Sequence, residues 1–327
     1  MVDLNTTYMG LTLKNPVMVS SCSLSNSIDG VCKIASIGAG AVVLKSLFEE
    51  QLDIETREIE RYIGHSWHTE AFDYVRNMGM QLGPNNYLKL IEGAKKSVSI
   101  PVIASLNCIS PRWWSEYAKK VENAGADGLE LNIAYLPVDF ERDSREVENI
   151  YYQIMEKIKE VVHIPVAVKI GSYFSSLASF AEELSRCGAN ALVLFNRFYQ
   201  IDVDIENISL KSGYQLSRSE EIGLPLRWIA LLSDRIQCDL AGSTGIHDGT
   251  GVIKIILAGA KVVQVCSTLY KNGLQQIEQI LDYLAAWMKE HKFESIEQFR
   301  GKVSQSQIEK PELWERLQYI KALVDIE

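Results

Sequence analysis

The sequence predicts an α/β protein that folds as a (β/α)8 TIM barrel. Two short patterns alternate along the chain and carry this prediction: Gly-Ala followed by an apolar run, and Pro-Val opening an apolar run. Interleaved, they give eight strands with helical segments between most of them, which implies parallel strands and right-handed crossovers. Eight units in 327 residues favour a closed barrel. A doubly wound open sheet is the alternative, but it gives no reason for the alternation.

The Gly-Ala pattern supplies the even-numbered strands. Each Gly follows a charge-rich, helix-like stretch, as is typical of a glycine that ends a helix. The run after it is rich in Val, Leu and Ile without clean alternation, as expected for a strand buried on both faces. The four segments are Ile37–Ser46, Ala124–Ile133, Cys187–Asn196 and Ala258–Ser267.

The Pro-Val pattern supplies three of the odd-numbered strands. They begin at Asn15, Ile100 and Ile164, and proline fits the first residue of a strand because its missing N–H is not needed there. The seventh strand, "CDLAGSTGI" from Cys238, lacks the proline but has the same apolar onset.

Two further segments lie outside this alternation. The connection Glu49–Leu90 is longer than a minimal strand-to-helix loop, and long loops on barrels often carry function. After about residue 274 the chain is predicted to form a helical C-terminal tail. Because no Pro/Ser-rich linker interrupts it, residues 1–327 are expected to form a single domain.

Composition restricts the partners. The net charge of −9 argues against a nucleic-acid groove or an anionic membrane surface. The six cysteines form no CxxC pair, so we expect no metal site or Fe–S cluster held by this chain. The first residues, "MVDLNTTYMG", have no apolar core of signal-peptide length, and no apolar run is long enough to span a bilayer. We therefore expect a cytoplasmic protein without a membrane partner.

Polar residues follow the predicted strands, where the active site of a TIM barrel lies. Lysines and asparagines among apolar strand ends need a partner, because a buried and unpaired charge is strongly unfavourable. The alternative for any one of them is that it points outward or pairs with a carboxylate. The candidates are Ser20, Ser21, Lys45, Ser46, Asn107, Asn132, Lys169, Asn196, Gly242, Ser243, Thr244, Gly245, Cys266 and Ser267.

The ends of strands 7 and 8 suggest a phosphate site. "AGSTGIHDG" and "VCSTLYKNG" place small and hydroxyl residues before helices, where backbone N–H groups can hold an anion. Barrels commonly bind phosphate with these two loops. A plain tight turn would have a similar sequence, so the pairing of the two loops carries the prediction.

In these segments and several others, the chain resembles the dihydroorotate dehydrogenases and the matching domain of dihydropyrimidine dehydrogenases. Both are FMN-dependent barrels. The similar segments include "GLTLKNPVMVSS", "GAVVLKS", "RNMGM", "GADGLELN", "IPVAVKI", "LVLFN", "GSTGIHDG" and "ILAGAKVVQVCSTLYKNG". The resemblance implies an FMN oxidoreductase that acts on a CH–CH bond of dihydroorotate, or of a related unsaturated small acid or pyrimidine, in pyrimidine biosynthesis. It also implies a small-molecule substrate, a soluble electron acceptor and a homodimer.

The resemblance implies roles for the matching positions. Lys45 and Lys169 would contact the flavin ring and ribityl chain, and the three asparagines would bind flavin or substrate. The loops at Thr244–Gly245 and Cys266–Ser267 would hold the phosphate, with the serines and Gly242 lining the cofactor site. Substrate would meet Asn132, Asn196 and a loop containing Asn77, Met78, Gly79 and Met80.

One position departs from the family pattern. Tyr135 stands where the family has a Cys or Ser base. The ordinary pKa of tyrosine is about 10, against about 8.5 for cysteine, so a phenol is better suited to donating a proton than to taking one. Lys45, Asn132 and Tyr135 are the predicted catalytic residues. Alternatively, Tyr135 is an ordinary packed aromatic, or His65 or His68 supplies the proton.

Three functions remain open from the sequence. The first is the dihydroorotate dehydrogenase-like flavin enzyme. The second is a flavin-binding barrel that has lost the proton chemistry. The third is a barrel enzyme of another class, such as a phosphosugar enzyme, that uses the same phosphate site. The paired lysines and three asparagines favour flavin over the third.

Overall fold

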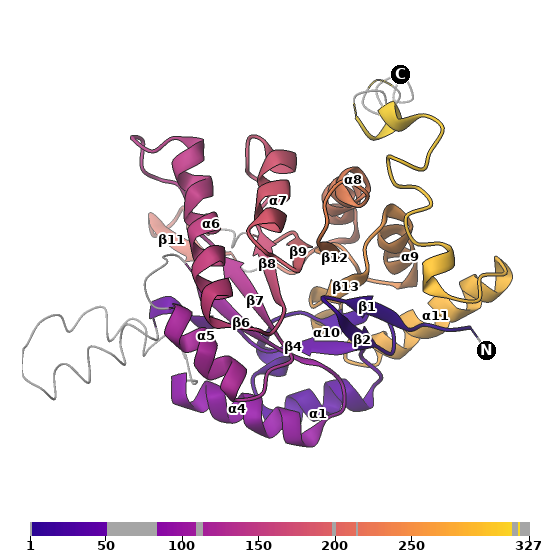
Figure 1. The fold of residues 1–327 in the computed structure, drawn as a ribbon, viewed down its shortest axis with the longest axis horizontal. Coiled ribbons are helices and arrows are strands. Elements are labelled where there is room, and N and C mark those ends of the chain that lie inside the picture. The colour runs from indigo at the N-terminus through magenta and orange to yellow at the C-terminus, as the bar shows by residue number, and fades with distance from the viewer. Residues whose placement is uncertain are drawn as a thin grey trace, which may run out of the picture.

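The computed structural model describes residues 2–50, 84–108, 114–197, 201–213, 215–315 and 320. Its central element is a closed barrel of eight parallel strands, which confirms the predicted (β/α)8 fold (Figure 1). Pairing runs in the order β3-β4-β6-β7-β8-β9-β12-β13, and β13 pairs back with β3. The strands are β3 (Val17–Val19), β4 (Ala41–Val43), β6 (Val102–Cys108), β7 (Gly128–Ile133), β8 (Val166–Ile170), β9 (Ala191–Leu194), β12 (Asp239–Ser243) and β13 (Val262–Val265).

Helices surround the barrel and bury their apolar faces against the outside of the strands (Figure 1). Side-chain caps fix several helix starts: the Asp143 carboxylate accepts from the N–H of Glu146, and the Asp248 carboxylate from the N–H of Gly251. The helices are α1 (Ile28–Ser36), α4 (Pro84–Ser97), α5 (Trp114–Asn123), α6 (Ser144–Val161), α7 (Leu177–Arg186), α8 (Gly223–Leu232), α9 (Gly249–Ala258), α10 (Ser267–Asn272) and α11 (Gln276–Glu290).

The glycines of the Gly-Ala pattern end helices, as the sequence predicts. Gly38, Gly125 and Gly188 follow α1, α5 and α7 with φ of 99°, 92° and 96°. Gly259 caps α9 with φ of 122°. Residues with a Cβ are strained at these angles, so glycine lets the chain leave each helix and enter the next strand directly.

An N-terminal hairpin, which the sequence analysis missed, closes the amino end of the barrel. Its strands β1 (Thr6–Tyr8) and β2 (Leu11–Leu13) pair in antiparallel register. Tyr8, Met9 and Leu13 are buried against residues of the barrel interior. The N–H of Met9 also donates to the Asp239 carboxylate at the start of β12 (2.7 Å). The interior is therefore packed at this end, and polar side chains gather at the other.

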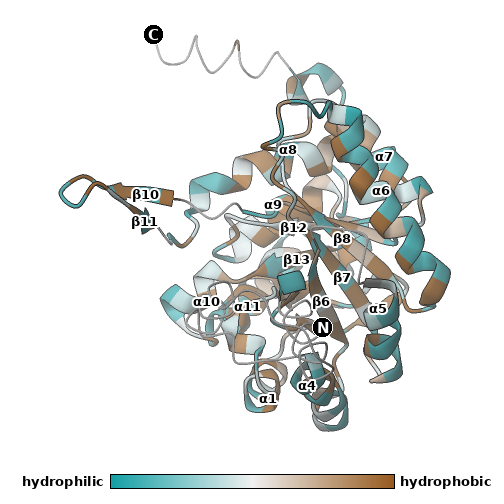
Figure 2. Ribbon diagram, turned by 90° about the vertical axis from the view of Figure 1, so that its left-hand side faces the viewer, coloured by the Kyte–Doolittle hydropathy of each residue, from teal (hydrophilic) through white to brown (hydrophobic). Residues whose placement is uncertain are grey.

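A second hairpin, also not predicted, is inserted after β9. It consists of β10 (Ile201–Asp204) and β11 (Ser209–Ser212), and it projects away from the barrel (Figure 2). A two-residue strand, β5 (Leu47–Phe48), extends the pairing beside the carboxyl end of β6. Short 3-10 turns complete the described part of the chain: η1 (Ser23–Ser25), η2 (Ser219–Ile222), η3 (Ile296–Gln298) and η4 (Pro311–Trp314).

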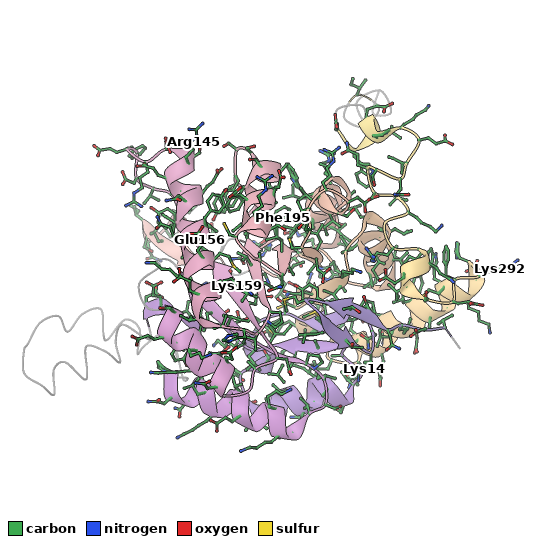
Figure 3. All side chains as sticks on the ribbon, in the orientation of Figure 1. Lys14, Arg145, Glu156, Lys159, Phe195 and Lys292 are labelled. Carbon is green, nitrogen blue, oxygen red and sulfur yellow. The ribbon has the colours of Figure 1, made fainter. Side chains whose placement is uncertain are left out.

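The structure can be compared with the two segments predicted outside the strand alternation. The long loop expected over Glu49–Leu90 is wrong at its end, because α4 begins at Pro84; residues 51–83 lie outside the described residues. Helix α11 lies within the region where the sequence predicts a helical tail, after about residue 274. Lys292 lies just beyond the end of this helix, at the edge of the molecule, whereas Phe195 lies near the carboxyl ends of the strands (Figure 3).

No helix in the described ranges is long and apolar enough to cross a membrane.

Candidate active site

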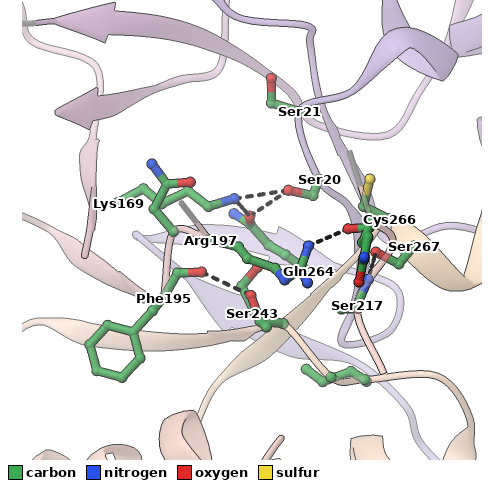
Figure 4. A pocket seen from close by; sticks show the side chains of 15 residues that line it. Ser20, Ser21, Lys169, Phe195, Arg197, Ser217, Ser243, Gln264, Cys266 and Ser267 are labelled. Atoms are coloured by element: carbon green, nitrogen blue, oxygen red, sulfur yellow. Dashed lines mark hydrogen bonds between the residues drawn. The ribbon is translucent and has the colours of Figure 1, made fainter. Parts of the chain in front are cut away.

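A buried lysine forms the centre of the polar cluster at the carboxyl end of the barrel. Lys169, on β8, is 7% exposed. Its ammonium donates to the hydroxyl of Ser20 (3.0 Å), which follows β3, and to the side-chain carbonyl of Gln264 on β13 (3.1 Å). Figure 4 shows the three side chains converging. Strands that are far apart in sequence thus hold one cation at a fixed position.

A buried carboxylate lies beneath this lysine. Glu130, on β7, is 1% exposed, and its Oε1 lies 4.0 Å from Nζ of Lys169. The amide nitrogen of Gln264 donates to its Oε2 (2.5 Å). Among the described residues Oε1 has no hydrogen-bond partner. Because an unpaired charge at such depth is strongly unfavourable, the lysine and the carboxylate depend on each other.

The predicted asparagines lie on neighbouring strands. Asn107 of β6, Asn132 of β7 and Lys169 of β8 occupy paired positions in the parallel register. The amide of Asn196, just after β9, donates to the side-chain oxygen of Asn132 (2.7 Å). Amides present both donors and acceptors without charge. This row of side chains is therefore suited to a planar, polar ring.

Ser21, Ser46 and Ser105 form a row of hydroxyl contacts near the carboxyl ends of β3, β4 and β6. Ser46 Oγ lies 2.9 Å from Ser21 Oγ and 2.8 Å from Ser105 Oγ, and the N–H of Ser46 donates to Ser21 (2.8 Å). Lys45 is the residue before Ser46 in the loop after β4, and it is half-buried. The contacts fix the loop that carries Lys45 against the loop after β3.

The loop after β12 makes a tight turn that requires glycine. Thr244 and Gly245 both have φ of 76°. A Cβ on Gly245 would lie 2.2 Å from the backbone nitrogen of Ile222, so the loop and η2 can approach closely only with glycine there. Gly242 has a different environment, because a Cβ at that position would meet the side chain of Ile255 in α9 at 2.5 Å. The Cβ position of Gly242 therefore points outward, towards α8 and α9.

Two loops meet beside this turn. The N–H of Ser217 donates to Ser267 Oγ (3.0 Å), and Ser217 Oγ lies 3.1 Å from His247 Nε2. Lys271 donates to the carbonyl of Ser217 (2.6 Å). Burial and the nearby Lys271 lower the pKa of His247. Hydroxyl, imidazole and ammonium groups therefore lie beside the turn, and groups of these kinds can bind an anion.

These groups line one cavity of about 160 Å³ (Figure 4). Among the predicted residues, nine line it: Ser20, Ser21, Lys169, Asn196, Ser243, Thr244, Gly245, Cys266 and Ser267. Asn132 and Ser46 contact lining residues through the hydrogen bonds above. The predicted substrate residues Asn77, Met78, Gly79 and Met80, together with His65 and His68, lie outside the described residues.

The structure adds lining residues that the sequence analysis did not select. Gln264, Phe195, Gln215 and Ser217 face the cavity. Arg197 does so as well, and its guanidinium pairs with Glu221 (2.7 Å) and donates to the carbonyl of Gln215. Alternation along the strands could have identified Glu130, which lies two residues before Asn132 and so on the same face of β7.

Tyr135 lies at the edge of the barrel end. Its hydroxyl accepts from Arg142 Nη1 (3.1 Å), and the residue is not among those lining the main cavity. Tyr173, which follows β8, lines a narrow cleft with Ala134, Gly171 and Asn196. Its hydroxyl donates to the carbonyl of Tyr135 (3.0 Å), and burial raises its pKa. Tyr173 therefore lies beside Asn196, whereas the Tyr135 hydroxyl is directed towards Arg142.

Comparison with known proteins agrees with this geometry. A family model described as dihydroorotate dehydrogenase matches residues 3–288. Curated relatives are named dihydroorotate dehydrogenase B (NAD(+)), catalytic subunit. That of Thermoplasma acidophilum is 25% identical over 92% of this chain and 99% of its own length, and that of Thermoplasma volcanium is 28% identical over 92% and 98%. The Pyrococcus furiosus relative is 25% identical over 89% and 96%. The chain therefore belongs to the dihydroorotate dehydrogenase family of oxidoreductases.

Proposed function

We propose that this oxidoreductase binds FMN and interconverts dihydroorotate and orotate, or a closely related unsaturated small acid or pyrimidine. The observation that carries the proposal is Lys169, held by Ser20 and Gln264 beside a tight turn at Thr244–Gly245. A fixed cation next to an anion-binding turn matches a ligand that has both a polar ring and a phosphate.

The residues present fit FMN in two respects. The turn at Gly245 packs so closely on η2 that a Cβ would clash with the Ile222 backbone, and together with Ser217 and Ser267 it lines the cavity where a phosphate could be held. The row of Lys169, Asn132 and Asn196 offers the ammonium and amide groups that a flavin ring and ribityl chain can use. The cavity of about 160 Å³ is smaller than the roughly 300 Å³ at which sites for drug-sized ligands begin, so it would enclose one portion of the nucleotide.

The bound flavin supplies the hydride acceptor. Lys169 would supply positive charge to a flavin ring, which gains negative charge on reduction, and Glu130 with Gln264 fixes the position of that ammonium. Lys45, from the loop after β4, is proposed to add a second cation. Ser20, Ser21, Ser46 and the loops at Thr244 and Ser267 would orient the ribityl chain and phosphate.

Asn132 and Asn196 are proposed to bind the substrate, because their mutual hydrogen bond leaves further amide positions for a ligand. Asn77, Met78, Gly79 and Met80 remain part of this proposal from the sequence.

Proton transfer is proposed to use Tyr135. In the direction that reduces the substrate, a phenol can donate a proton to the carbon next to the one that receives hydride. Tyr173 is the second candidate, because it lines the cleft with Asn196. Tyr135→Phe and Tyr173→Phe separate the two: the variant that lacks the donor should lose turnover about 100-fold, while the other keeps it within a fewfold.

A soluble electron acceptor completes the proposed reaction. The relatives are named as the catalytic subunit of an NAD(+)-linked enzyme, so we propose that electrons leave this chain through a separate protein subunit. Location in the cytoplasm is part of the same proposal; all six cysteines are free, as is usual where thiols are kept reduced.

A homodimer is also proposed, and the projecting hairpin supports it. One face of this ribbon carries Ile201, Val203 and Leu210, which are 72%, 56% and 78% exposed. Two-stranded hairpins are marginal in water, and exposed apolar patches mark interfaces. A second copy related by a twofold axis would cover this face with its own hairpin. Val203→Asp should then halve the mass measured by light scattering, whereas Asp202→Asn on the opposite face should not.

Cofactor binding is tested by titrating the apoprotein with FMN and following flavin fluorescence. The proposal expects saturable binding that Lys169→Met weakens at least tenfold, and that Lys159→Met, which changes a lysine on α6, leaves unchanged. Equal affinities for the wild type and Lys169→Met would contradict the proposed role of the buried ammonium.

A further inference from the structure

Cys22 and Cys266 lie side by side at the ends of two paired strands. Val19 of β3 pairs with Val265 of β13, and the N–H of Ser20 donates to the carbonyl of Val265 (2.9 Å). Cys266 follows Val265 directly at the start of α10, and Cys22 lies three residues after Val19 at the start of η1. The two thiols are close enough to affect each other's pKa.

Tyr270 holds the two loops together. Its hydroxyl accepts from the N–H of Ser23 (3.0 Å) and lies 2.5 Å from Ser23 Oγ. It also interacts with the Cys22 thiol, and its own N–H bonds back to the carbonyl of Cys266 (3.3 Å). The loop after β3 and the first turn of α10 are thus fixed against each other. The proximity of the two sulfurs follows from this arrangement of the backbone.

The two thiols are chemically unequal. The hydrogen bond from Cys266, aided by contacts with the backbone at Leu24 and Ser25 and with Tyr270, lowers the pKa of Cys22 to about 7 despite its burial. The same hydrogen bond raises the pKa of Cys266, which the positive charge of Lys169 partly opposes. Both residues are partly exposed. An accessible, low-pKa thiol beside a second thiol is the arrangement of a redox-active pair.

The other cysteines contrast with Cys22. Burial raises the pKa of Cys108 and of Cys187, and it raises that of Cys238 to about 11. Acidic neighbours add to the increase for Cys108 and Cys187. At neutral pH these three remain protonated and unreactive, so the reactivity of the pair is distinct from that of ordinary buried thiols.

We propose that Cys22 and Cys266 form a redox-active dithiol that exchanges with small-molecule disulfides. The Cys22 thiolate attacks one sulfur of the disulfide RSSR, forms Cys22–S–S–R and releases RS⁻. The Cys266 sulfur then loses its proton to solvent and attacks Cys22, which forms the Cys22–Cys266 disulfide and releases a second RS⁻. Two protein thiols are oxidised, one RSSR is reduced, and the two RS⁻ take up two protons.

The second step is favoured by the first. Once Cys22 is joined to the small molecule, its thiolate no longer opposes ionisation of Cys266, while Lys169 still favours it. Cys266 also lines the cavity, between Gln264 and Ser267. The dithiol therefore lies at the edge of the ligand site, although its chemistry does not depend on a bound flavin.

The first experiment measures thiol reactivity in the full-length, reduced protein. Each cysteine is alkylated with iodoacetamide across a range of pH and quantified by peptide mass spectrometry. We expect Cys22 to react fastest, with a midpoint at about pH 7. Cys266→Ala should move that midpoint upward because it removes the hydrogen-bond donor, whereas Cys187→Ala should leave it in place. Alkylation of Cys22 no faster than that of Cys187 would overturn the proposal.

The second experiment oxidises the same protein with oxidised glutathione and maps its peptides without reduction. The wild type should give a Cys22–Cys266 linked peptide, and Cys266→Ala should instead accumulate glutathione on Cys22. A wild-type protein in which glutathione stays on Cys22, with no linked peptide, would contradict the resolving role of Cys266. The wild-type map decides this even if a variant folds poorly.

Discussion

The ammonium of Lys169 lies 4.0 Å from the Glu130 carboxylate inside the barrel, and Gln264 bonds to both side chains. Lys169 and Gln264 line the cavity, and Glu130 lies beneath them. This network fixes the position of the lysine proposed to meet the flavin.

The first prediction concerns the dependence of the two charges on each other. Lys169→Met leaves the buried Glu130 carboxylate without its cation, and the free energy of unfolding should fall by about 3 kcal/mol. Adding Glu130→Gln to that variant removes the stranded charge and should restore part of the loss. Urea unfolding of the three proteins measures both effects. A single variant as stable as the wild type would show that the pair does not interact.

Gln264 is expected to act on both stability and ligand binding. Gln264→Leu removes the acceptor of Lys169 and Ser20 and the donor to Glu130, so stability should fall by about 1 to 3 kcal/mol. Gln305→Leu is the matched control, because Gln305 is also buried but bonds to Glu315 and does not line the cavity. Both variants should be destabilised, and FMN affinity should fall only for Gln264→Leu. Equal affinities would remove Gln264 from the cofactor site.

The tight turn at Gly245 is expected to be intolerant of a side chain. Gly245→Ala combines a φ of 76° with a contact of 2.2 Å to the Ile222 backbone, so FMN affinity should fall at least tenfold. Gly10→Ala has a similar φ of 77° but nothing within 4 Å. It should lose about 1 kcal/mol of stability from backbone strain and keep its affinity. Comparable affinities for the two variants would mean that the turn does not hold the phosphate.

Acid stability should depend on Glu122, which joins the end of α5 to the segment before β8. Although burial alone would raise its pKa, hydrogen bonds from Lys119 and from the N–H groups of His163 and Ile164 hold the pKa at about 2, below its ordinary 4.5. A carboxyl whose pKa is depressed on folding stabilises the native state above its unfolded pKa. That contribution is lost as pH falls from 4.5 towards 2.

Glu122→Gln should therefore reduce stability at neutral pH and flatten the decline between these pH values. Glu148→Gln serves as the control, because burial raises the pKa of Glu148 and its protonation is not unfavourable to folding. Denaturant midpoints measured across this pH range check the prediction. A Glu122→Gln curve parallel to that of the wild type would contradict it.

The barrel could be predicted from sequence because its signals are local. Gly38, Gly125 and Gly188 mark helix ends through backbone angles that glycine alone adopts easily, and the apolar run after each forms a buried strand. The N-terminal hairpin could not be recognised in this way. Its strands are three residues long, and only contact with the barrel interior explains why Tyr8 and Leu13 are buried.

Site residues at the ends of strands could be predicted from the sequence. Contacts between side chains on strands that are distant in sequence could not. Lys169 and Asn196 follow from their places at strand ends, but the contact of Lys169 with Gln264 depends on closure of the barrel. Alternation along β7 would have identified Glu130. The direction of the Tyr135 hydroxyl, towards Arg142, is a tertiary feature that spacing does not encode.

The most direct measurement is anaerobic addition of dihydroorotate to the FMN-loaded protein while its visible flavin band is recorded. We expect the band to bleach and to return when orotate or an electron acceptor is added. A bound flavin whose band does not change would contradict dehydrogenation of dihydroorotate and leave a flavin-binding barrel with another substrate or none. If FMN is not retained at all, the proposed cofactor itself is wrong.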